Sequence, residues 1–344
     1  MSPVDPDPQV PEARLSESAK AVERRLLGAE RELRRREVSG AVGTSLLSAR
    51  KFWRALGFPN VGDAAQAFTE ADVEALRAMV GLVRDGVIDE ETALGLTRAM
   101  GRTADRLANW QIQLVAESLT EEDHAAPDVE VAQQVGVVLA EVLERTEPLL
   151  TYAWRRHLAS AAARMISDAE ADAGAHPGPV RTVGFADLVS FTRIVRRASE
   201  RELAGLVQRF EATTSDIVSA HGGRVVKTVG DEVLFVSTST PAAGGIALDI
   251  AEAMAEDEVL PDVRVGMATG PVVARLGDVF GTTVNRASRL TGIAAPGTVL
   301  VDETTAARLG AASGFEVTPL HRRTLRGIGA VTPAVLRRST RRSA

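Results

Sequence analysis

Apolar residues recur at helical spacing through the first half of the chain. Residues 16–37 interleave Glu and Arg among strong helix formers, and LLSARKFWRALGFPNV continues as an apolar-periodic segment ended by Gly57 and Pro59. Further helices are expected from Thr69, from Asp89, over 103–118, and after Pro127 with an interruption near Pro148. No stretch of residues 13–170 alternates as a strand does, so this half is predicted to be all-helical.

The pattern changes after the Gly- and Pro-rich segment 173–179, which is typical of a domain boundary. Beyond it, β-rich runs alternate with helical ones: VRTVGFADLV, a helix over 200–220, RVVKTVG, EVLFVS, PAAGGIALDIAEAMAED and VRVGMATGPVVARL. This βαββαβ order predicts a ferredoxin-like sheet with helices on one face, and an α+β chain overall. The expected divisions are a disordered tail at 1–12, a helical domain at 13–170, a linker at 171–179 and a second domain at 180–340.

Composition narrows the class of protein. The 344 residues suffice for two cores, and 45% hydrophobic with 25% charged residues is ordinary for a globular chain. A net charge of −6 argues against a dedicated nucleic-acid binder, and the absence of cysteine excludes disulfides and thiolate chemistry. Neither a membrane-length apolar run nor a signal-peptide pattern is present, so a cytoplasmic protein without a membrane partner is expected.

Two acidic residues stand at the ends of predicted strands. Asp187 follows the apolar run VGFA, and Asp231 lies in the hairpin tip Gly230-Asp231-Glu232. The first strand and the hairpin are neighbours in a ferredoxin-like sheet, so the two carboxylates can converge. Without His or Cys nearby, such a pair suits Mg²⁺ or Mn²⁺ held together with a phosphate substrate. The alternative is that Asp187 caps a helix and that Asp231 is an ordinary turn residue.

A second candidate is the run DVFGTTVNRASRL at residues 278–290. Asn285 and Arg289 are four residues apart and share one face of a predicted helix. Such pairs are usually solvated, but the apolar and small neighbours around them predict a mostly buried helix. The pair is therefore expected to point into a site.

Three runs in this half, FADLVSFT, KTVGDEV and DVFGTTVNRASRL, resemble the signatures of class III nucleotidyl cyclases, the adenylyl and guanylyl cyclases. They occur in the family's order, and the resemblance covers about residues 180–340. It implies an enzyme that converts ATP or GTP to the 3′,5′-cyclic nucleotide and pyrophosphate, with two Mg²⁺ or Mn²⁺ ions per site.

The resemblance also implies a role for each matching residue. Asp187 and Asp231 match the metal ligands, and Lys227 and Asp278 match the pair that reads the purine. Asn285 and Arg289 match the residues that orient the ribose and stabilise the transition state. Arg326 stands where the family usually has a triphosphate-binding Lys. Backbone amides at Phe191 and Thr192, which begin a predicted helix, can cradle the terminal phosphates.

Base chemistry favours ATP as the substrate. Adenine accepts a hydrogen bond at N1 and donates from its 6-amino group, which suits Lys227 and Asp278 respectively. Guanine reverses both edges, and a buried mismatch of this kind can discriminate by ~10⁴. The family further implies a head-to-tail homodimer, in which the aspartates of one chain face Lys227 and Asn285 of the other.

The helical half has several possible roles. Residues 40–125 are similar to the regulatory domain that precedes some actinobacterial cyclases and inhibits them, which predicts autoinhibition here. The same stretch resembles a MerR-type helix-turn-helix, so a DNA-binding regulator stays an alternative, as does a non-catalytic dimerisation or nucleotide-binding platform. Three of the five histidines, His124, His157 and His176, lie where the halves join, and their protonation is a candidate pH switch.

Overall fold

A computed structural model describes residues 16–120, 129–171 and 179–339. The chain divides into two compact units, residues 1–161 and 162–344. The expected tail at 1–12 lies outside the described residues, as do His124, His176 and most of the expected linker.

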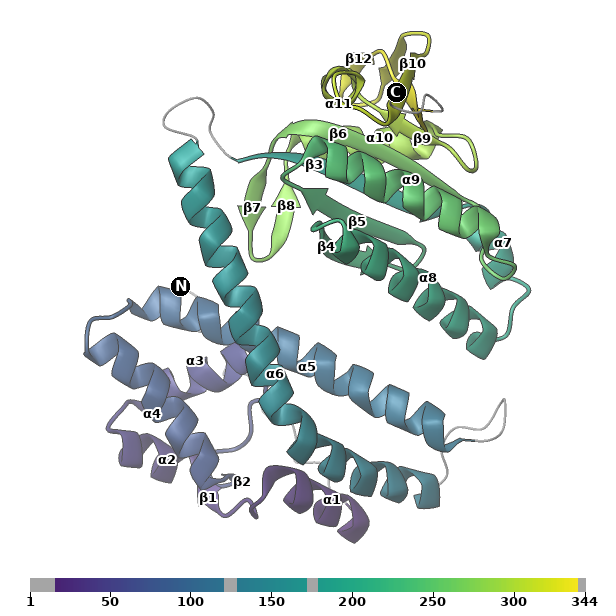
Figure 1. Ribbon diagram of the computed structural model, residues 1–344. Coiled ribbons are helices and arrows are strands. Elements are labelled where there is room, and N and C mark those ends of the chain that lie inside the picture. The colour runs from purple at the N-terminus through teal and green to yellow at the C-terminus, as the bar shows by residue number, and fades with distance from the viewer. Residues whose placement is uncertain (1–15, 121–128, 172–178, 340–344) are drawn as a thin grey trace, which may run out of the picture. The chain divides into compact units, whose positions relative to one another are not determined.

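The first unit is helical, as predicted, apart from one short ladder (Figure 1). Its helices are α1 (Glu17–Leu27), α2 (Arg35–Val42), α3 (Leu46–Leu56), α4 (Glu70–Arg84), α5 (Glu90–Leu119) and most of α6 (Val129–Ala171). The antiparallel strands β1 (Leu33–Arg34) and β2 (Gln66–Phe68) were not predicted, because two or three residues are too short to show alternation.

Three helices in this unit differ from prediction. The single helix expected over 16–37 is broken at Gly28, whose φ of +68° is a left-handed conformation that ends α1. The two helices expected after Asp89 are one continuous helix, α5. Helix α6 continues past Pro148, where an interruption was expected.

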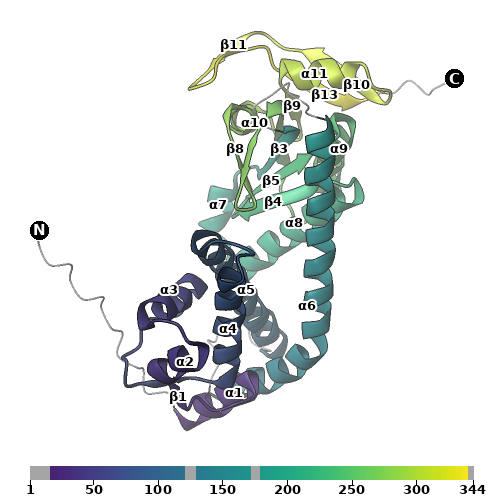
Figure 2. The ribbon, with the colours of Figure 1, turned by 90° about the vertical axis from the view of Figure 1, so that its left-hand side faces the viewer.

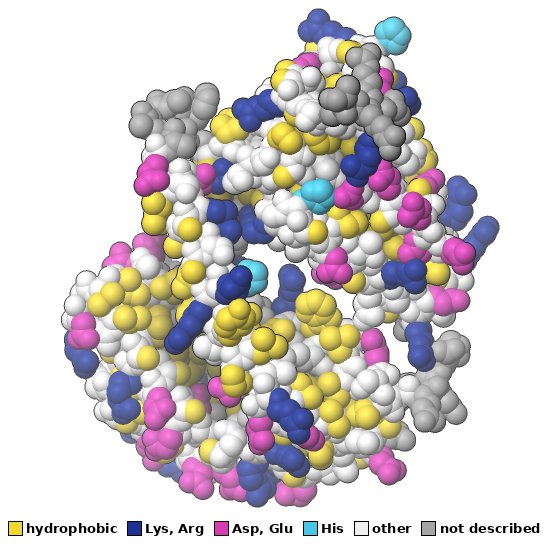
Figure 3. All heavy atoms as spheres, viewed as in Figure 1, with side chains coloured by type: hydrophobic (Ala, Val, Ile, Leu, Met, Phe, Trp, Pro, Cys, Tyr) yellow, Lys and Arg dark blue, Asp and Glu magenta, His cyan; other side chains and the backbone are white. Residues whose placement is uncertain are grey.

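An aromatic cluster forms the centre of this unit. The ring of Trp53 lies 4.7 Å from that of Phe52 and 5.1 Å from that of Phe68, measured between centroids. Beside the cluster, the guanidinium of Arg35 is buried and donates to Asp63, Nη1 to Oδ1, at 2.8 Å. Several large hydrophobic side chains of α5 and α6 are exposed, and they gather at the surface over these helices (Figure 3). Trp110 on α5 is 46% exposed, and Leu149 on α6 is 61% exposed.

The second unit is built on one seven-stranded mixed sheet with the order β10-β13-β9-β6-β3-β5-β4. Its main elements are β3 (Val180–Leu188), α7 (Phe191–Val195), α8 (Glu200–Ala220), β4 (Arg224–Val229), β5 (Glu232–Ser237), α9 (Thr240–Glu256) and β6 (Val263–Pro271). The four strands β6-β3-β5-β4 pair antiparallel, which confirms the predicted ferredoxin-like βαββαβ core.

The remaining elements extend this core. They are the hairpin β7 (Val273–Arg275) and β8 (Asp278–Phe280), α10 (Thr282–Ile293), β9 (Val299–Val301), α11 (Glu303–Gly310), β10 (Phe315–Pro319), β11 (Arg323–Leu325), β12 (Gly329–Val331) and β13 (Ala334–Arg338). The strand expected over VRVGMATGPVVARL is thus two strands, β6 and β7.

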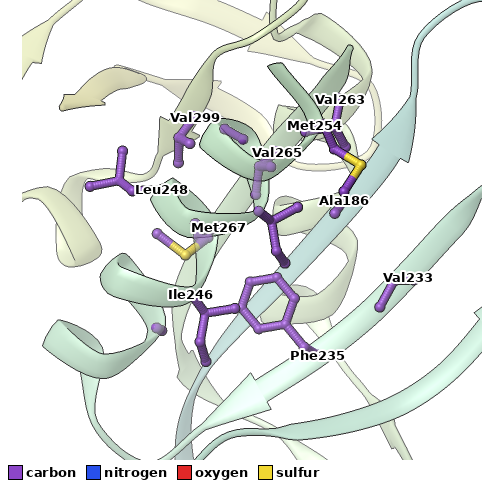
Figure 4. Packing of buried hydrophobic residues seen from close by; sticks show 14 of the residues in the cluster. Ala186, Val233, Phe235, Ile246, Leu248, Met254, Val263, Val265, Met267 and Val299 are labelled. Atoms are coloured by element: carbon purple, nitrogen blue, oxygen red, sulfur yellow. The ribbon is translucent and has the colours of Figure 1, made fainter. Parts of the chain in front are cut away.

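Helices α8 and α9 cover one face of the sheet. There Phe235 and Ala186 pack against Ile246 and Met254 of α9 (Figure 4). The prediction of helices on one face only is wrong, because α10 covers the other face together with the β7–β8 hairpin. Figure 2 shows α9 and α10 on opposite sides of β3.

Gly266 on β6 allows α10 to lie directly against the sheet. A Cβ at this position would stand 2.1 Å from the backbone nitrogen of Thr291. The Thr291 hydroxyl also donates to the carbonyl oxygen of Phe185 on β3, at 3.3 Å. The helix is therefore fixed to two strands of the sheet at its C-terminal half.

This close approach generates a prediction. We expect Gly266→Ala to lower the free energy of unfolding by about 1–3 kcal/mol, because overpacking displaces backbone as well as side chains. Helix α10 carries the candidate site residues Asn285 and Arg289, so any activity that depends on them should fall as well. The matched control is Gly292→Ala on the same helix, where a Cβ meets nothing within 4 Å. Chemical denaturation and activity measured on both variants test this, and an unperturbed Gly266→Ala protein would contradict it.

Candidate active site

The two predicted metal-binding aspartates come together at the end of β3. Asp187 is the penultimate residue of that strand, and Asp231 lies in the two-residue turn between β4 and β5. The backbone nitrogen of Leu188 donates to the carbonyl oxygen of Asp231 at 3.0 Å, which ties the turn to the strand end. Burial raises the pKa of the Asp231 carboxyl, and the neighbouring charge of Asp187 raises it further. The convergence expected from the topology is present.

Two residues beside them were missed. Glu232 and Arg264 both pair with Asp187 in the sheet, one on each side. The Arg264 Nε donates to Asp187 Oδ2 at 2.6 Å. The pKa of Glu232 is raised by burial and then by the charges of Asp187 and Asp231. A signal existed for Arg264, since it is the one charged position between the apolar residues of VRVGMA.

This group of side chains supplies oxygen donors of the kind that a divalent cation prefers. The carboxylates of Asp187, Asp231 and Glu232 lie close together with Arg264 as the paired cation, and hard oxygen donors suit Mg²⁺ or Mn²⁺. The raised pKa values of Asp231 and Glu232 mark negative charge that a divalent cation would neutralise. Across the described residues, no group of three or more acidic or histidine side chains is placed to hold a metal ion. Such a site suits an ion that is also held by substrate phosphates.

The two residues expected to read the purine contact each other. Lys227 Nζ donates to Asp278 Oδ2 at 2.6 Å, and both side chains are partly exposed. Burial tends to raise the pKa of Asp278, but hydrogen bonds from Lys227 and the Val279 backbone, with nearby positive charge, lower it overall. Asp278 is therefore held as a carboxylate, ready to accept a hydrogen bond.

A β-bulge places Lys227 on this face. Val225 pairs with Phe235 and packs on the α8–α9 side, whereas Lys227 pairs with Leu234, which faces α10. In a regular strand residues two apart share a face, so the extra residue Val226 is what separates them. Sequence alternation alone would have put Lys227 on the wrong side of the sheet.

Asn285 and Arg289 lie on the exposed face of α10. The prediction of a mostly buried helix holds only for the opposite face, where Ala287 and Leu290 are fully buried. Arg286, which follows Asn285 in the helix, turns inward, and its Nη1 donates to the buried Asp302 Oδ2 at 3.0 Å. Among the residues that the structure describes, Asn285 and Arg289 have no side-chain hydrogen bond or ion pair with the carboxylates or with Lys227.

The residues predicted to contact the phosphates lie at the start of α7 and in the turn between β11 and β12. Ser190 has a left-handed φ of 61°, and α7 begins directly after it at Phe191 and Thr192. Phe191 packs against the core of the sheet, so its backbone rather than its ring is available. Arg326 is exposed in the turn between β11 and β12.

The chain was compared with known proteins. Residues 177–337 match the family described as the adenylate and guanylate cyclase catalytic domain. An adenylate cyclase of Glutamicibacter nicotianae is 45% identical over 335 residues, covering 94% of this chain and 83% of that protein. An adenylate cyclase of Streptomyces coelicolor is also 45% identical, over 87% of this chain and 78% of its own length. A pH-sensitive adenylate cyclase of Mycobacterium tuberculosis is 30% identical, over 85% and 75% respectively.

The chain belongs to the class III adenylate and guanylate cyclase family. Within it, the similarity to adenylate cyclases extends over nearly the whole chain, helical half included, and its activity is that of an adenylate cyclase. The alternative of a non-catalytic platform is therefore set aside. Within the described ranges, no helix has the length and apolar character needed to span a membrane.

Proposed function

We propose that this adenylate cyclase recognises ATP through Lys227 and Asp278 and cyclises it beside Asp187 and Asp231. The observation that carries the proposal is the 2.6 Å contact between Lys227 Nζ and Asp278 Oδ2. It holds one donor and one acceptor side by side, in the arrangement that N1 and the 6-amino group of adenine require. Either group would be left unmatched by guanine.

The chemistry is an in-line displacement. The ribose 3′-oxygen attacks the α-phosphorus, the bond to the β-phosphate oxygen breaks, and pyrophosphate leaves. Two Mg²⁺ or Mn²⁺ ions, when bound, would activate the hydroxyl and polarise the phosphates. Asp187 and Asp231 supply the oxygen ligands for them.

Other residues position the substrate. Asn285 orients the ribose, and Arg289 offsets negative charge that develops on the α-phosphate. Backbone amides at Phe191 and Thr192, with the guanidinium of Arg326, hold the terminal phosphates.

The site is completed by a second copy of the chain. In support, Asn285 and Arg289 lie on an exposed face of α10 and contact neither the carboxylates nor Lys227 within the described chain. A two-fold pair of catalytic units would present them, with Lys227 and Asp278, to the aspartates of the partner, and would make two equal sites.

The helical half controls the catalytic half. Support comes from α6, one continuous helix that runs from the first unit into the second. Near its end Asp168 pairs with Arg181 at the start of β3, the strand that carries Asp187. His157 is exposed on α6 and is the one described member of the histidine group proposed to sense pH. The relative from Mycobacterium tuberculosis is named as pH-sensitive, which supports the same proposal.

The first test concerns base choice. We expect the double variant Lys227→Glu, Asp278→Cys to lose at least about 100-fold in kcat/KM for ATP, because two charge-assisted hydrogen bonds are removed. Its discrimination against GTP should disappear, while the melting temperature stays close to that of the unchanged protein. Full activity on ATP in this variant would contradict the assignment of Lys227 and Asp278 as the residues that recognise adenine.

The second test concerns the shared sites. Asp187→Ala and Asn285→Ala should each be nearly inactive, because each lesion damages both sites of a homodimer. After mixing and subunit exchange, half the dimers are mixed, and each of these has one intact site. Activity should therefore return to about a quarter of wild type. No recovery despite demonstrated exchange would refute shared sites.

The third test concerns control. Removing residues 1–170 should raise activity about fivefold or more, a common size for allosteric coupling. The pH dependence between about 5.5 and 8 should flatten, because His124 and His157 are removed with the helical half. Activity and pH profiles of the two chain lengths decide the matter. An equally pH-dependent shortened chain would exclude a switch at His124 and His157, and unchanged activity would exclude autoinhibition.

A further inference from the structure

Arg224 on β4 holds the hairpin that carries Asp278. Its Nη1 donates to the carbonyl oxygen of Gly277 at 3.1 Å, and Gly277 directly precedes Asp278. Arg224 and Lys227 are three residues apart, a spacing that puts side chains on opposite faces of a regular strand. The bulge at Val226 puts both on the α10 side, where both reach the β7–β8 hairpin.

The hairpin needs such a tie. Its two strands have three residues each, and an isolated two-stranded hairpin of this length is marginal in water. Leu276, at its tip, is 74% exposed and has a left-handed φ of 54°, an unfavourable conformation for a non-glycine residue. Val279 is buried against the body of the sheet, and the hydrogen bond from Arg224 to Gly277 adds a second contact, on the other side of Asp278.

Several charged side chains surround Arg224. Burial lowers the pKa of its guanidinium, as do the charges of Arg164 and Arg181, while the charge of Asp278 opposes them. Asp168 pairs with Arg181 and thereby offsets part of this positive charge. Arg224 remains a cation throughout the physiological range, and its charge also favours the ionised form of Asp278.

We propose that Arg224 is a positioning residue for base recognition, which fixes Asp278 where it accepts a hydrogen bond from the 6-amino group of ATP. The inference rests on the proposed role of Asp278. It adds a residue that touches no substrate atom and acts through the Gly277 carbonyl. A residue acting in this way affects only the part of recognition that depends on the 6-amino group.

This selectivity gives a sharp experiment. Purine riboside 5′-triphosphate retains N1 of the base but lacks the 6-amino group. In the full-length protein, we expect Arg224→Met to lower kcat/KM for ATP about tenfold, the size of one lost charge-assisted hydrogen bond. The effect on purine riboside triphosphate should be less than about twofold, because Asp278 has no partner on that base. Arg224→Lys, which keeps the charge and a donor, should recover part of the loss.

The matched control is Arg209→Met on α8, an exposed arginine whose Nε donates to Asp257 at 2.7 Å, outside the proposed site. It should change neither substrate's kinetics. Equal losses on both substrates for Arg224→Met would mean a general structural role and would overturn the proposal, and so would no loss on either.

The variant Asp278→Ala distinguishes failure of this inference from failure of the proposed recognition of adenine. If Asp278→Ala loses activity on ATP selectively but Arg224→Met does not, only the role of Arg224 fails. If Asp278→Ala affects both substrates equally, the proposed recognition of adenine fails first.

Discussion

Burial of neighbouring carboxylates at the end of β3 is the constraint on which the catalytic unit depends. Asp187, Asp231 and Glu232 are held close together with Arg264 as the paired cation, and burial raises the pKa of the last two carboxyls. Such an arrangement opposes folding, and it persists because the same strands bury Phe235 and its neighbours on their other face. The hydrophobic face thus maintains a charged edge that a divalent cation and a triphosphate are suited to occupy.

The two faces of the sheet therefore have different tasks. The face under α8 and α9 is a continuous apolar core that supplies stability. The face under α10 and the β7–β8 hairpin carries Lys227, Asp278, Asn285 and Arg289, all of them partly or largely exposed. Its smaller apolar cluster seats the helix without covering these side chains. Polar groups can stay accessible here because the opposite face already buries most of the apolar surface.

Much of this arrangement could be predicted from the sequence, and the failures have physical causes. The convergence of Asp187 with Asp231 follows from strand order, which alternating hydrophobicity and the hairpin turn define. The orientation of Lys227 could not be predicted, because a bulge adds a residue without any compositional mark. Arg264 was missed because a charged residue in a half-buried strand is usually solvated. The single helix expected over 16–37 was wrong because Gly28, one residue, outweighs the helix propensity of its neighbours.

The contact between Gly266 and the backbone of Thr291 limits how this enzyme can be controlled. A helix seated against bare backbone has no room to slide or rotate, because any other register would bring a side chain against the strand. Asn285 and Arg289 thus keep their places relative to the sheet of the catalytic unit. If the helical half regulates a homodimer as proposed above, the freedom left to it is the orientation of the two catalytic units toward each other. Under the proposed shared sites, control would therefore act through the geometry of assembly, with each catalytic unit behaving as a rigid part.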